Sequence, residues 1–323
     1  MTNILFCNST EPACGVYQYG RNFYHAISTK SRFNFIYAQP TSLEEMMVLV
    51  EKHEVAAVLY NWHPDQGGFI KEAPYKLEMN GRPIREVLIY HDWEPNTVKF
   101  DAVLFSDPTM KPHTNWIPVP RPLPPTVVRP EKLRPAGLPV IGVHGFYGAS
   151  SDRVVEQVMK DFDAAIIRLH LPFAYYGDRE GKTALELAQR SMELAQRRPG
   201  FEVQVSHEWL DTPALIAWLA DNDLNCYLRD TAGVWRGVSS ALDAALAARR
   251  PIAVNRCQGF RHAFDCTPSI LIEDRTLKEI LSSGLAPLQP LYDANTNERL
   301  AARVESVLLA LVGNTSSVPP EKV

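Results

Sequence analysis

One stretch in the last third of the chain constrains the fold more than any other. Residues 223–228 are predicted to form a short buried strand, and residues 252–254 a second strand directly after a proline. Between them, a polar loop leads into an alanine- and leucine-rich helix at about residues 239–249. Strand, helix and strand in this order make a βαβ unit, which needs a parallel sheet. The sequence therefore predicts an α/β protein.

Positive charge gathers in the loop of this unit, where the helix begins. Arg229 and Arg236 lie in the loop, and Gly237 comes just before Ser239 and Ser240, which open the helix. A helix N-terminus presents free N–H groups and the positive end of its dipole, and nearby guanidinium groups add to its attraction for anions. The pattern predicts a phosphate or diphosphate site.

Residues 237–254 resemble the donor-binding segment of GT-B-fold glycosyltransferases, most closely glycosyltransferase family 4. In that family a Gly/Ser turn opens a helix of small residues that ends in Gly-x-Pro-Val-Val, and this chain has Arg-Arg-Pro-Ile-Ala-Val. The family also carries two glutamates separated by seven residues. Their places, aligned on Pro251, hold Arg236 and Ala244, and Asp243 lies one residue from the second place. This departure affects the usual contacts to the ribose and the sugar.

Asp243 has two interpretations. The resemblance implies a donor-binding position close to that of the second glutamate. Ser240-Ala-Leu-Asp243 also matches a capping box, in which the first and fourth side chains bond to backbone N–H groups at a helix start. The sequence leaves both open.

Composition indicates an ordinary globular protein. The chain has 323 residues, 46% of them apolar and 22% charged, with a net charge of −4, which is enough for two domains. No apolar run approaches the roughly 18 residues of a membrane span, so any membrane contact would be peripheral. The first residues lack a secretion signal, and we expect a cytoplasmic protein. With no basic run, general nucleic-acid binding is not expected.

Five cysteines show neither a C-x-x-C motif nor zinc spacing. Their odd number, without a secretion signal, indicates reduced thiols. Cys7 and Cys226 fall within predicted strands, where a cysteine is usually a small core residue rather than a nucleophile. We expect no metal site.

The first domain, residues 1–120, is predicted to alternate strands with helices. The predicted helices cover residues 21–28 and 42–53. The predicted strands cover residues 3–8, 33–38, 55–60, 84–90, 102–106 and 116–119.

Two strands of this domain are followed by histidines. His63 follows the third predicted strand, and His91 with Asp92 follows the next. Ligands of doubly wound sheets bind outside the carboxyl ends of the strands, so these three residues are candidates for the catalytic site. His91 could act as a general base whose tautomer Asp92 holds, or the pair could bind sugar hydroxyls. Either histidine could also be a hydrogen-bonded turn residue.

The loop predicted at residues 9–20 contains Gly15 and Gly20, which let a backbone approach a ligand closely because glycine has no Cβ. From the spacing alone, a plain βα turn explains them equally well. In the glycosyltransferase family, a glycine-rich loop after the first strand lies in the interdomain cleft. The similarity of this segment to that loop implies that Gly15, Tyr17 and Arg21 are cleft residues.

Eight prolines between residues 117 and 139 mark a domain boundary. Such a run cannot continue a helix or a central strand, and it forms a stiff connector. Residues 121–138 are predicted to link the first domain to a second one at residues 139–290. A terminal helix at residues 291–312 and a tail at residues 313–323 follow. The resemblance implies two Rossmann-like domains facing a cleft, with this helix crossing back to the first.

A glycine-containing turn follows the first strand of the second domain, before a helix predicted at residues 151–162. Gly142, Gly145 and Gly148 do not have the spacing of a dinucleotide fingerprint, so no nicotinamide site is predicted. The turn is similar to the family's first donor-domain turn, where a following basic residue reaches the diphosphate. The resemblance implies that role for Arg153, beside Gly145. A solvated helix face is the other interpretation of Arg153.

The resemblance implies a function in polysaccharide biosynthesis. A sugar would move from a nucleotide-diphosphate donor to a hydroxyl of a glycan, a lipid-linked acceptor or another acceptor, with retained configuration and without a metal or other cofactor. The loop arginines would stabilise the departing diphosphate. Two alternatives remain: a nucleotide-sugar 2-epimerase on the same fold, and a non-catalytic protein that binds sugar nucleotides or glycans.

Overall fold

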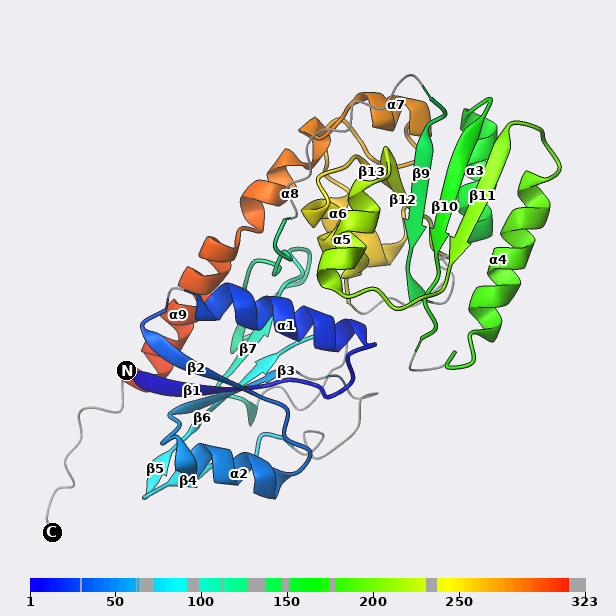
Figure 1. Ribbon diagram of the computed structural model, residues 1–323. Coiled ribbons are helices and arrows are strands. Elements are labelled where there is room, and N and C mark those ends of the chain that lie inside the picture. Colours follow the sequence, from blue (N-terminus) through cyan, green and yellow to red (C-terminus); the bar gives the residue numbers. More distant parts are fainter. Residues whose placement is uncertain are drawn as a thin grey trace, which may run out of the picture. The chain divides into compact units, whose positions relative to one another are not determined.

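The computed structural model describes residues 1–29, 31–61, 63, 73–91, 99–111, 113–126, 137–146, 151–174, 178–230 and 237–313. These residues form two compact units (Figure 1). The first unit comprises Met1–Pro122 and Asn295–Val323, and the second comprises Leu123–Ala294. Each unit is built around its own parallel sheet.

The first unit has a six-stranded sheet in the order β2-β1-β3-β6-β7-β8, with every neighbouring pair parallel. Its strands are β1 (Thr2–Cys7), β2 (Phe33–Ala38), β3 (Ala57–Asn61), β6 (Arg85–Ile89), β7 (Ala102–Phe105) and β8 (Trp116–Pro118). Its helices are α1 (Gly15–Ser28), α2 (Leu43–Lys52) and α9 (Asn297–Gly313). A short hairpin joins β4 (Glu78–Met79) to β5 (Arg82–Pro83).

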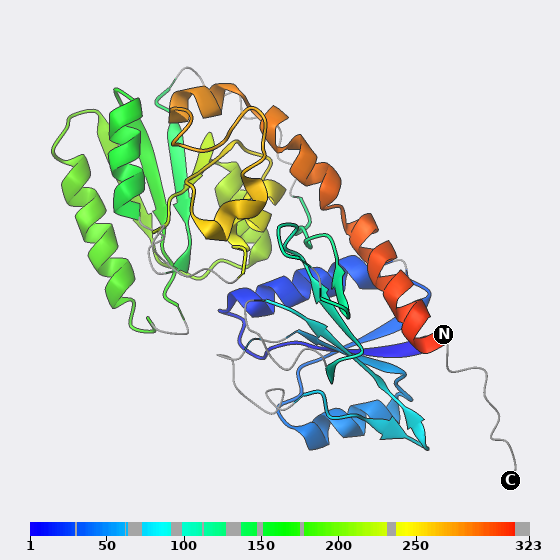
Figure 2. The same ribbon diagram turned by 180° about the vertical axis from the view of Figure 1, so that it is seen from behind.

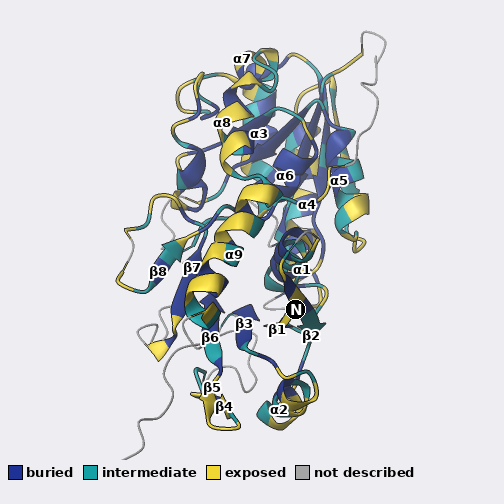
Figure 3. Cartoon of the chain, turned by 90° about the vertical axis from the view of Figure 1, so that its left-hand side faces the viewer, coloured by how far each residue is buried: buried dark blue, intermediate teal, exposed yellow. Residues whose placement is uncertain are grey.

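Both faces of this sheet are buried, which is why its strands are almost continuously apolar (Figure 3). Ile4 and Phe6 of β1 pack toward α1 and α9, whereas Leu5 and Cys7 pack on the other face with α2. The stripe that α9 buries has helical spacing and consists of Leu300, Val304, Val307 and Leu308. The C-terminal helix therefore packs on the first unit, as predicted.

The second unit has a five-stranded parallel sheet in the order β11-β10-β9-β12-β13. Its strands are β9 (Val140–His144), β10 (Ala165–His170), β11 (Phe201–Ser206), β12 (Leu224–Tyr227) and β13 (Ile252–Val254). Its helices are α3 (Ser151–Asp161), α4 (Lys182–Ala195), α5 (Thr212–Ala220), α6 (Ala241–Ala247), α7 (Leu277–Ser282) and α8 (Gln289–Ala294), and a 3-10 segment covers Gln258–Ala263.

Helices cover both faces of the second sheet (Figure 2). One face packs against α3, α4 and α7, and the other against α5 and α6. The predicted βαβ unit is confirmed, because β12 and β13 are parallel neighbours on either side of α6 in the chain. Both sheets are doubly wound, and their strand order reverses between β1 and β3 in the first unit and between β9 and β12 in the second.

Candidate functional site

The switch point of the first sheet is bridged by two asparagines. Asn8 follows β1 and Asn61 ends β3, and both side chains are buried. Asn61 Nδ2 donates to Asn8 Oδ1 at 2.6 Å and to the carbonyl of Val16 at 2.9 Å. Asn8 Nδ2 donates to the carbonyl of Tyr17 at 3.1 Å and to the hydroxyl of Tyr37 at 2.8 Å. The first turn of α1 is thereby tied to the carboxyl ends of two neighbouring strands.

The prediction of a glycine-containing loop at residues 9–20 is wrong for its second half. Helix α1 begins at Gly15, so Tyr17 and Arg21 are helical residues. Gly20 is buried inside the helix, and a Cβ there would overlap with Asn61 Nδ2 and Asn8 Oδ1. Because glycine has no side chain, the two asparagines can pack directly against the helix at this position. The glycine therefore makes room for the asparagine pair and does not form a turn. The guanidinium carbon of Arg21 lies 6.0 Å from the centre of the Tyr17 ring.

His91 joins this network from the carboxyl end of the next strand, β6. Its Nε2 lies 2.8 Å from Asn61 Oδ1, and its ring meets the edge of Tyr19 at 4.9 Å between centroids. The Tyr19 hydroxyl pairs with Ser106 Oγ at 2.6 Å, and the Arg121 guanidinium lies 5.7 Å from the Tyr19 ring centre. The sequence singled out His91 but not Asn61, Ser106 or Arg121 as site residues.

Of the other two candidates of the first unit, the structure describes His63, which is partly buried just beyond β3. Asp92 lies outside the described residues, so its predicted role in orienting His91 stays a prediction.

Arg229 lies at the switch point of the second sheet, just beyond β12. The side chain of Asn255, which follows β13, holds its backbone: Arg229 N donates to Asn255 Oδ1 at 3.0 Å, and Asn255 Nδ2 donates to Arg229 O at 2.7 Å. Burial lowers the pKa of the Arg229 guanidinium. Burial of a cation costs free energy that a bound anion would offset.

Arg153, an exposed residue of α3, lies close to Arg229. Its Nη1 donates to the carbonyl of Arg229 at 3.5 Å. A cavity of about 460 Å³ opens there, lined by Arg153, Glu156, Gln157, Lys160, Leu228, Asn255, Ile272 and Glu273. Two of the predicted anion-binding arginines are therefore neighbours, although 76 residues separate them in the chain.

The structure agrees only in part with the anion site predicted at the start of helix α6. Helix α6 has just seven residues, and Ser240 makes no side-chain capping bond, so the capping-box interpretation of Ser240 and Asp243 is wrong. Asp243 is 3% exposed inside the helix. Ser239 N donates to the carbonyl of Gly259 at 2.8 Å, which ties the turn to the 3-10 segment.

The 3-10 segment also binds the backbone of Gly237. The carbonyl of Gly237 accepts a hydrogen bond from Arg261 Nη1 at 3.2 Å. Arg261 is thus a further arginine beside the loop, whereas Arg236 lies outside the described residues.

Two histidines at adjacent strand ends were not predicted as site residues. His144 ends β9 and His170 ends β10, and the parallel register stacks their rings 5.8 Å apart. Gly145 follows His144 with a φ of 154°, and its N–H donates to the carbonyl of His170 at 3.3 Å. Burial, together with the charges of His170 and Arg229, lowers the pKa of His144 to about 3. Burial likewise lowers the pKa of His170 to about 4, so both are neutral hydrogen-bonding groups at pH 7.

An aromatic rim lies along the same carboxyl edge. The rings of Phe146, after β9, and Trp209, after β11, stack 6.3 Å apart with an interplanar angle of 16°. Phe173, after β10, contacts the ring of His207 at 5.4 Å. Trp209 and Phe173 are 42% and 37% exposed. Sequence patterns did not reveal this rim, because its members are far apart in the chain.

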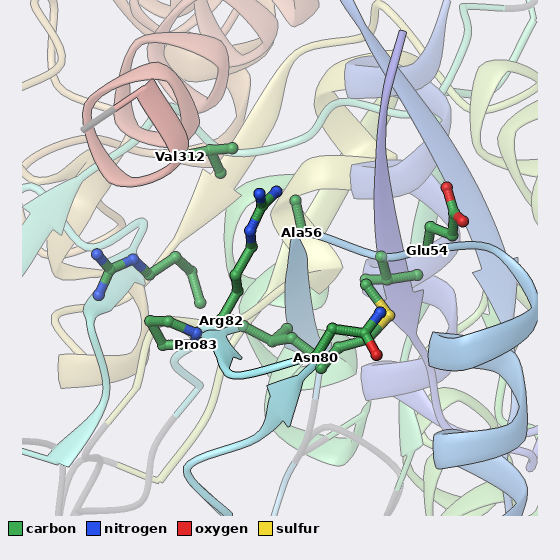
Figure 4. A pocket seen from close by; sticks show the side chains of 10 residues that line it. Glu54, Ala56, Asn80, Arg82, Pro83 and Val312 are labelled. Carbon is green, nitrogen blue, oxygen red and sulfur yellow. The ribbon is translucent and has the colours of Figure 1, made fainter. Parts of the chain in front are cut away.

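A second cavity, of about 520 Å³, lies in the first unit at the opposite edge of its sheet (Figure 4). Residues at the amino ends of β3 and β6, the β4–β5 hairpin and the end of α9 line it, among them Glu54, Asn80, Arg82, Arg85 and Val312. Arg85 is engaged there with Asp101 at 3.1 Å and with the carbonyl of Leu311 at 3.1 Å. Since ligands of doubly wound sheets bind at the carboxyl edge, this cavity is not the candidate site.

Three further observations concern the predicted chemistry. Among the described residues, no group of three or more His, Cys, Asp or Glu side chains is placed to hold a metal ion. All five cysteines are buried thiols, and burial raises the pKa of Cys7 and Cys226, which suits the predicted core role of these two. Across the described helices, none combines the length and the apolar character that a membrane crossing requires.

Comparison with known proteins rests on the fold, because no family profile and no curated protein matches the sequence. AviGT4, a glycosyltransferase involved in avilamycin A biosynthesis, is similar with a TM-score of 0.61 and 12% identity, over 97% of this chain and 99% of that one. The trehalose-6-phosphate synthase OtsA gives 0.61 and 10%, over 99% and 100%. Anabaena HepE, solved in complex with UDP-glucose, gives 0.54 and 14%, over 98% and 100%.

The chain has the GT-B fold. The predicted fold class of two Rossmann-like domains is confirmed, and the similarity extends over nearly the full length of each of these proteins. At 10–14% identity the comparison establishes the fold alone. The function must therefore be argued from the side chains of this chain.

Proposed function

We propose that this GT-B protein is a glycosyltransferase that uses a nucleotide-diphosphate sugar as donor. The observation that carries the proposal is the partly buried side chain of Arg229 at the switch point of the second sheet, with Arg153 Nη1 at the carbonyl of the same residue. Two neighbouring arginines, one of them partly buried, fit a dianion such as the diphosphate of a sugar nucleotide. The similarity to HepE, which was solved with UDP-glucose, points to the same ligand class.

The second unit would stabilise the leaving group. When the bond from the sugar to the diphosphate breaks, negative charge develops on the phosphate oxygen. Arg229 and Arg153, with the N–H groups of Val238 and Ser240, would face that charge, and Arg236 would join them. Fixed donors aimed at developing charge contribute about 3 kcal/mol each. With guanidinium groups in this role, the transfer needs no metal ion, and we propose that it retains the anomeric configuration.

The aromatic rim of the second unit would hold the nucleobase. Trp209 offers an exposed ring, stacked on the partly buried ring of Phe146, next to the strand ends that carry His144 and His170. A base stacked on an aromatic side chain gains about 1–3 kcal/mol.

The first unit would orient the acceptor hydroxyl or the transferred sugar. His91, Tyr19 and Asn61 make a network of hydrogen-bonding groups, which matches sugar hydroxyls. His63 and Asp92 are proposed to act on the same side, and Gly15, Tyr17 and Arg21 to lie near the substrate. The acceptor is a glycan or another hydroxyl compound.

Thermal unfolding with a panel of nucleoside diphosphates and nucleotide sugars tests the proposal, with EDTA and with Mg²⁺ in parallel. A ligand at 100 times its dissociation constant stabilises a protein by about 2.7 kcal/mol, which raises the melting temperature measurably. We expect one nucleotide family to raise it equally in EDTA and in Mg²⁺. If no member of the panel shifts the transition, the donor site is refuted.

Variants of the two arginines locate the site. Arg153→Ala and Arg229→Ala should each weaken nucleoside diphosphate binding at least tenfold. Arg197→Ala removes an exposed arginine near the end of α4 in the same unit and should leave binding unchanged. Equal affinity in all three variants would contradict the assignment of the site.

The reaction products separate the alternatives. A transferase releases the nucleoside diphosphate in proportion to the glycosylated acceptor, whereas a 2-epimerase releases it together with an epimerised free sugar and without any acceptor. The non-catalytic alternative predicts donor binding without release, and the absence of the family's glutamate pair favours it.

A further inference from the structure

The hydrogen bonds of the first unit fix the orientation of two side-chain amides. Asn8 lies against the carbonyl of Tyr17, and Asn61 lies against the carbonyl of Val16. A backbone carbonyl only accepts hydrogen bonds, so each amide must turn its NH₂ group toward helix α1. Asn8 Oδ1 is then left to accept from Asn61 Nδ2, and Asn61 Oδ1 faces His91 Nε2 at 2.8 Å.

The proton of His91 follows from this orientation. An amide oxygen cannot donate, so the bond between Asn61 Oδ1 and His91 Nε2 requires a proton on Nε2. A neutral imidazole carries only one ring proton, and Nδ1 is therefore the nitrogen with the lone pair.

We propose that Asn61 is a positioning residue that holds His91 in the Nε2–H tautomer, with Nδ1 as the hydrogen-bond acceptor for a hydroxyl of the substrate. This inference rests on the proposed function for the identity of the substrate, but not for the tautomer. Asn61 performs the task that the sequence assigned to Asp92.

The neutral amide makes a chemical difference. A carboxylate behind an imidazole stabilises the imidazolium, whereas an amide selects the tautomer without adding negative charge. Tyr19, whose ring edge meets His91, is also uncharged, and the guanidinium of Arg121 lies on Tyr19.

Helix α1 holds the side chains of both asparagines in place. Gly20 presses against the two asparagines without a side chain in between, and the carbonyls of Val16 and Tyr17 engage them from the first turn. Buried amides held from both sides cannot flip without leaving carbonyls and N–H groups unpaired, which costs about 1–3 kcal/mol per group. Asn61 is therefore a fixed support for the imidazole.

The tautomer can be measured directly on the full-length protein without any ligand. In ¹⁵N-labelled protein, long-range ¹H–¹⁵N correlation spectra distinguish protonated Nε2 from protonated Nδ1 at a pH where the ring is neutral. The chain has nine histidines, and His91→Gln identifies the signals of His91 by their loss. We expect the Nε2–H pattern in the unmodified protein, and an Nδ1–H pattern would overturn the proposal even if the variants below do not fold.

Asn61→Leu removes the acceptor at similar size. The signals of His91 should shift toward a mixture of tautomers, and KM for the sugar donor or acceptor should rise together with a loss in kcat. Asn34→Leu is the matched control: Asn34 is exposed on β2 and bonds Asn3 at 2.8 Å in the same unit, so the spectrum of His91 should not change. An Asn61→Leu spectrum with the unaltered Nε2–H pattern would refute the positioning role.

Failure of the proposed function would look different. If the protein neither binds nor transfers nucleotide sugars but His91 shows the Nε2–H pattern and loses it in Asn61→Leu, the tautomer assignment holds and only the identity of the substrate is wrong.

Discussion

The side chain of Asn255 hydrogen-bonds to both the N–H and the C=O of Arg229, 26 residues earlier in the chain. An amide side chain placed in this way takes the place of a neighbouring strand's backbone, beyond Tyr227 and Val254, the last paired residues of β12 and β13. The backbone of Arg229 is therefore fixed before any ligand arrives, and a fixed donor does not have to be ordered when the charge of the leaving group develops.

Asn255→Ala is accordingly expected to weaken nucleoside diphosphate binding about 10- to 100-fold, because it releases the backbone that carries Arg229 and leaves two buried groups unpaired. Isothermal titration calorimetry measures the change. Asn115→Ala removes a comparable bond to the carbonyl of Phe100 in the first unit, and should lower stability without changing the affinity. An Asn255→Ala protein with full affinity would show that Arg229 needs no such support.

The close packing of α1 at Gly20 is tested by whether Gly20→Ala raises or lowers the free energy of unfolding. Alanine in a helix interior is normally about 1 kcal/mol more favourable than glycine. At Gly20 the added Cβ would overlap with Asn8 and Asn61, so we expect the free energy of unfolding in denaturant to fall instead. Gly313→Ala has open space around its Cβ at the end of α9 and should be neutral or slightly stabilising. A more stable Gly20→Ala protein would contradict the close packing.

Most of the fold could be predicted from the sequence, because buried parallel strands are apolar runs. The start of α1 was missed because its N-cap, Cys14, makes no side-chain capping bond and no acidic residue lies in the first turn. Strand β10 was also missed, since Arg168 interrupts its apolar run. The structure places that guanidinium 4.6 Å from the ring centre of Trp218 and 2.8 Å from Asn222 Oδ1, which explains how the strand carries a charge.

The site was predictable only in part. Arg229 and His91 stood out because they follow strands, and Arg153 because the turn before it is similar to the family's first donor-domain turn. Their partners Asn255 and Asn61 did not, because the pairing of distant strand ends depends on sheet order and register, which a single sequence does not display. The stacking of His144 on His170 has the same origin.

Trp209→Ala should distinguish binding of the nucleobase from binding of the diphosphate. Without the exposed indole, affinity for a nucleoside diphosphate is expected to fall about 5- to 100-fold, the equivalent of about 1–3 kcal/mol of stacking. Affinity for inorganic diphosphate should stay the same, because the arginines are untouched. Leu185→Ala removes another large exposed apolar side chain of the second unit and serves as control. An equal loss for both ligands would mean that Trp209 supports the fold rather than the base.

The buried histidine pair makes stability depend on pH. Burial lowers the pKa of His144 to about 3 and that of His170 to about 4, from about 6.5 in an unfolded chain. Between these values the unfolded state binds protons that the folded state excludes. The stabilisation is therefore fully present above pH 6.5 and is lost as the pH falls toward 4 and 3.

Denaturant unfolding at a series of pH values measures this dependence. The free energy of unfolding should decline steadily between pH 6.5 and 4, and His144→Gln, which cannot be protonated, should decline less steeply over that range. His25→Gln removes an exposed histidine at the end of α1 and should follow the unmodified protein. If the His144→Gln and unmodified curves run parallel, His144 takes up its proton equally well in the folded and unfolded states. The neutral pair beside the diphosphate site would then be disproved.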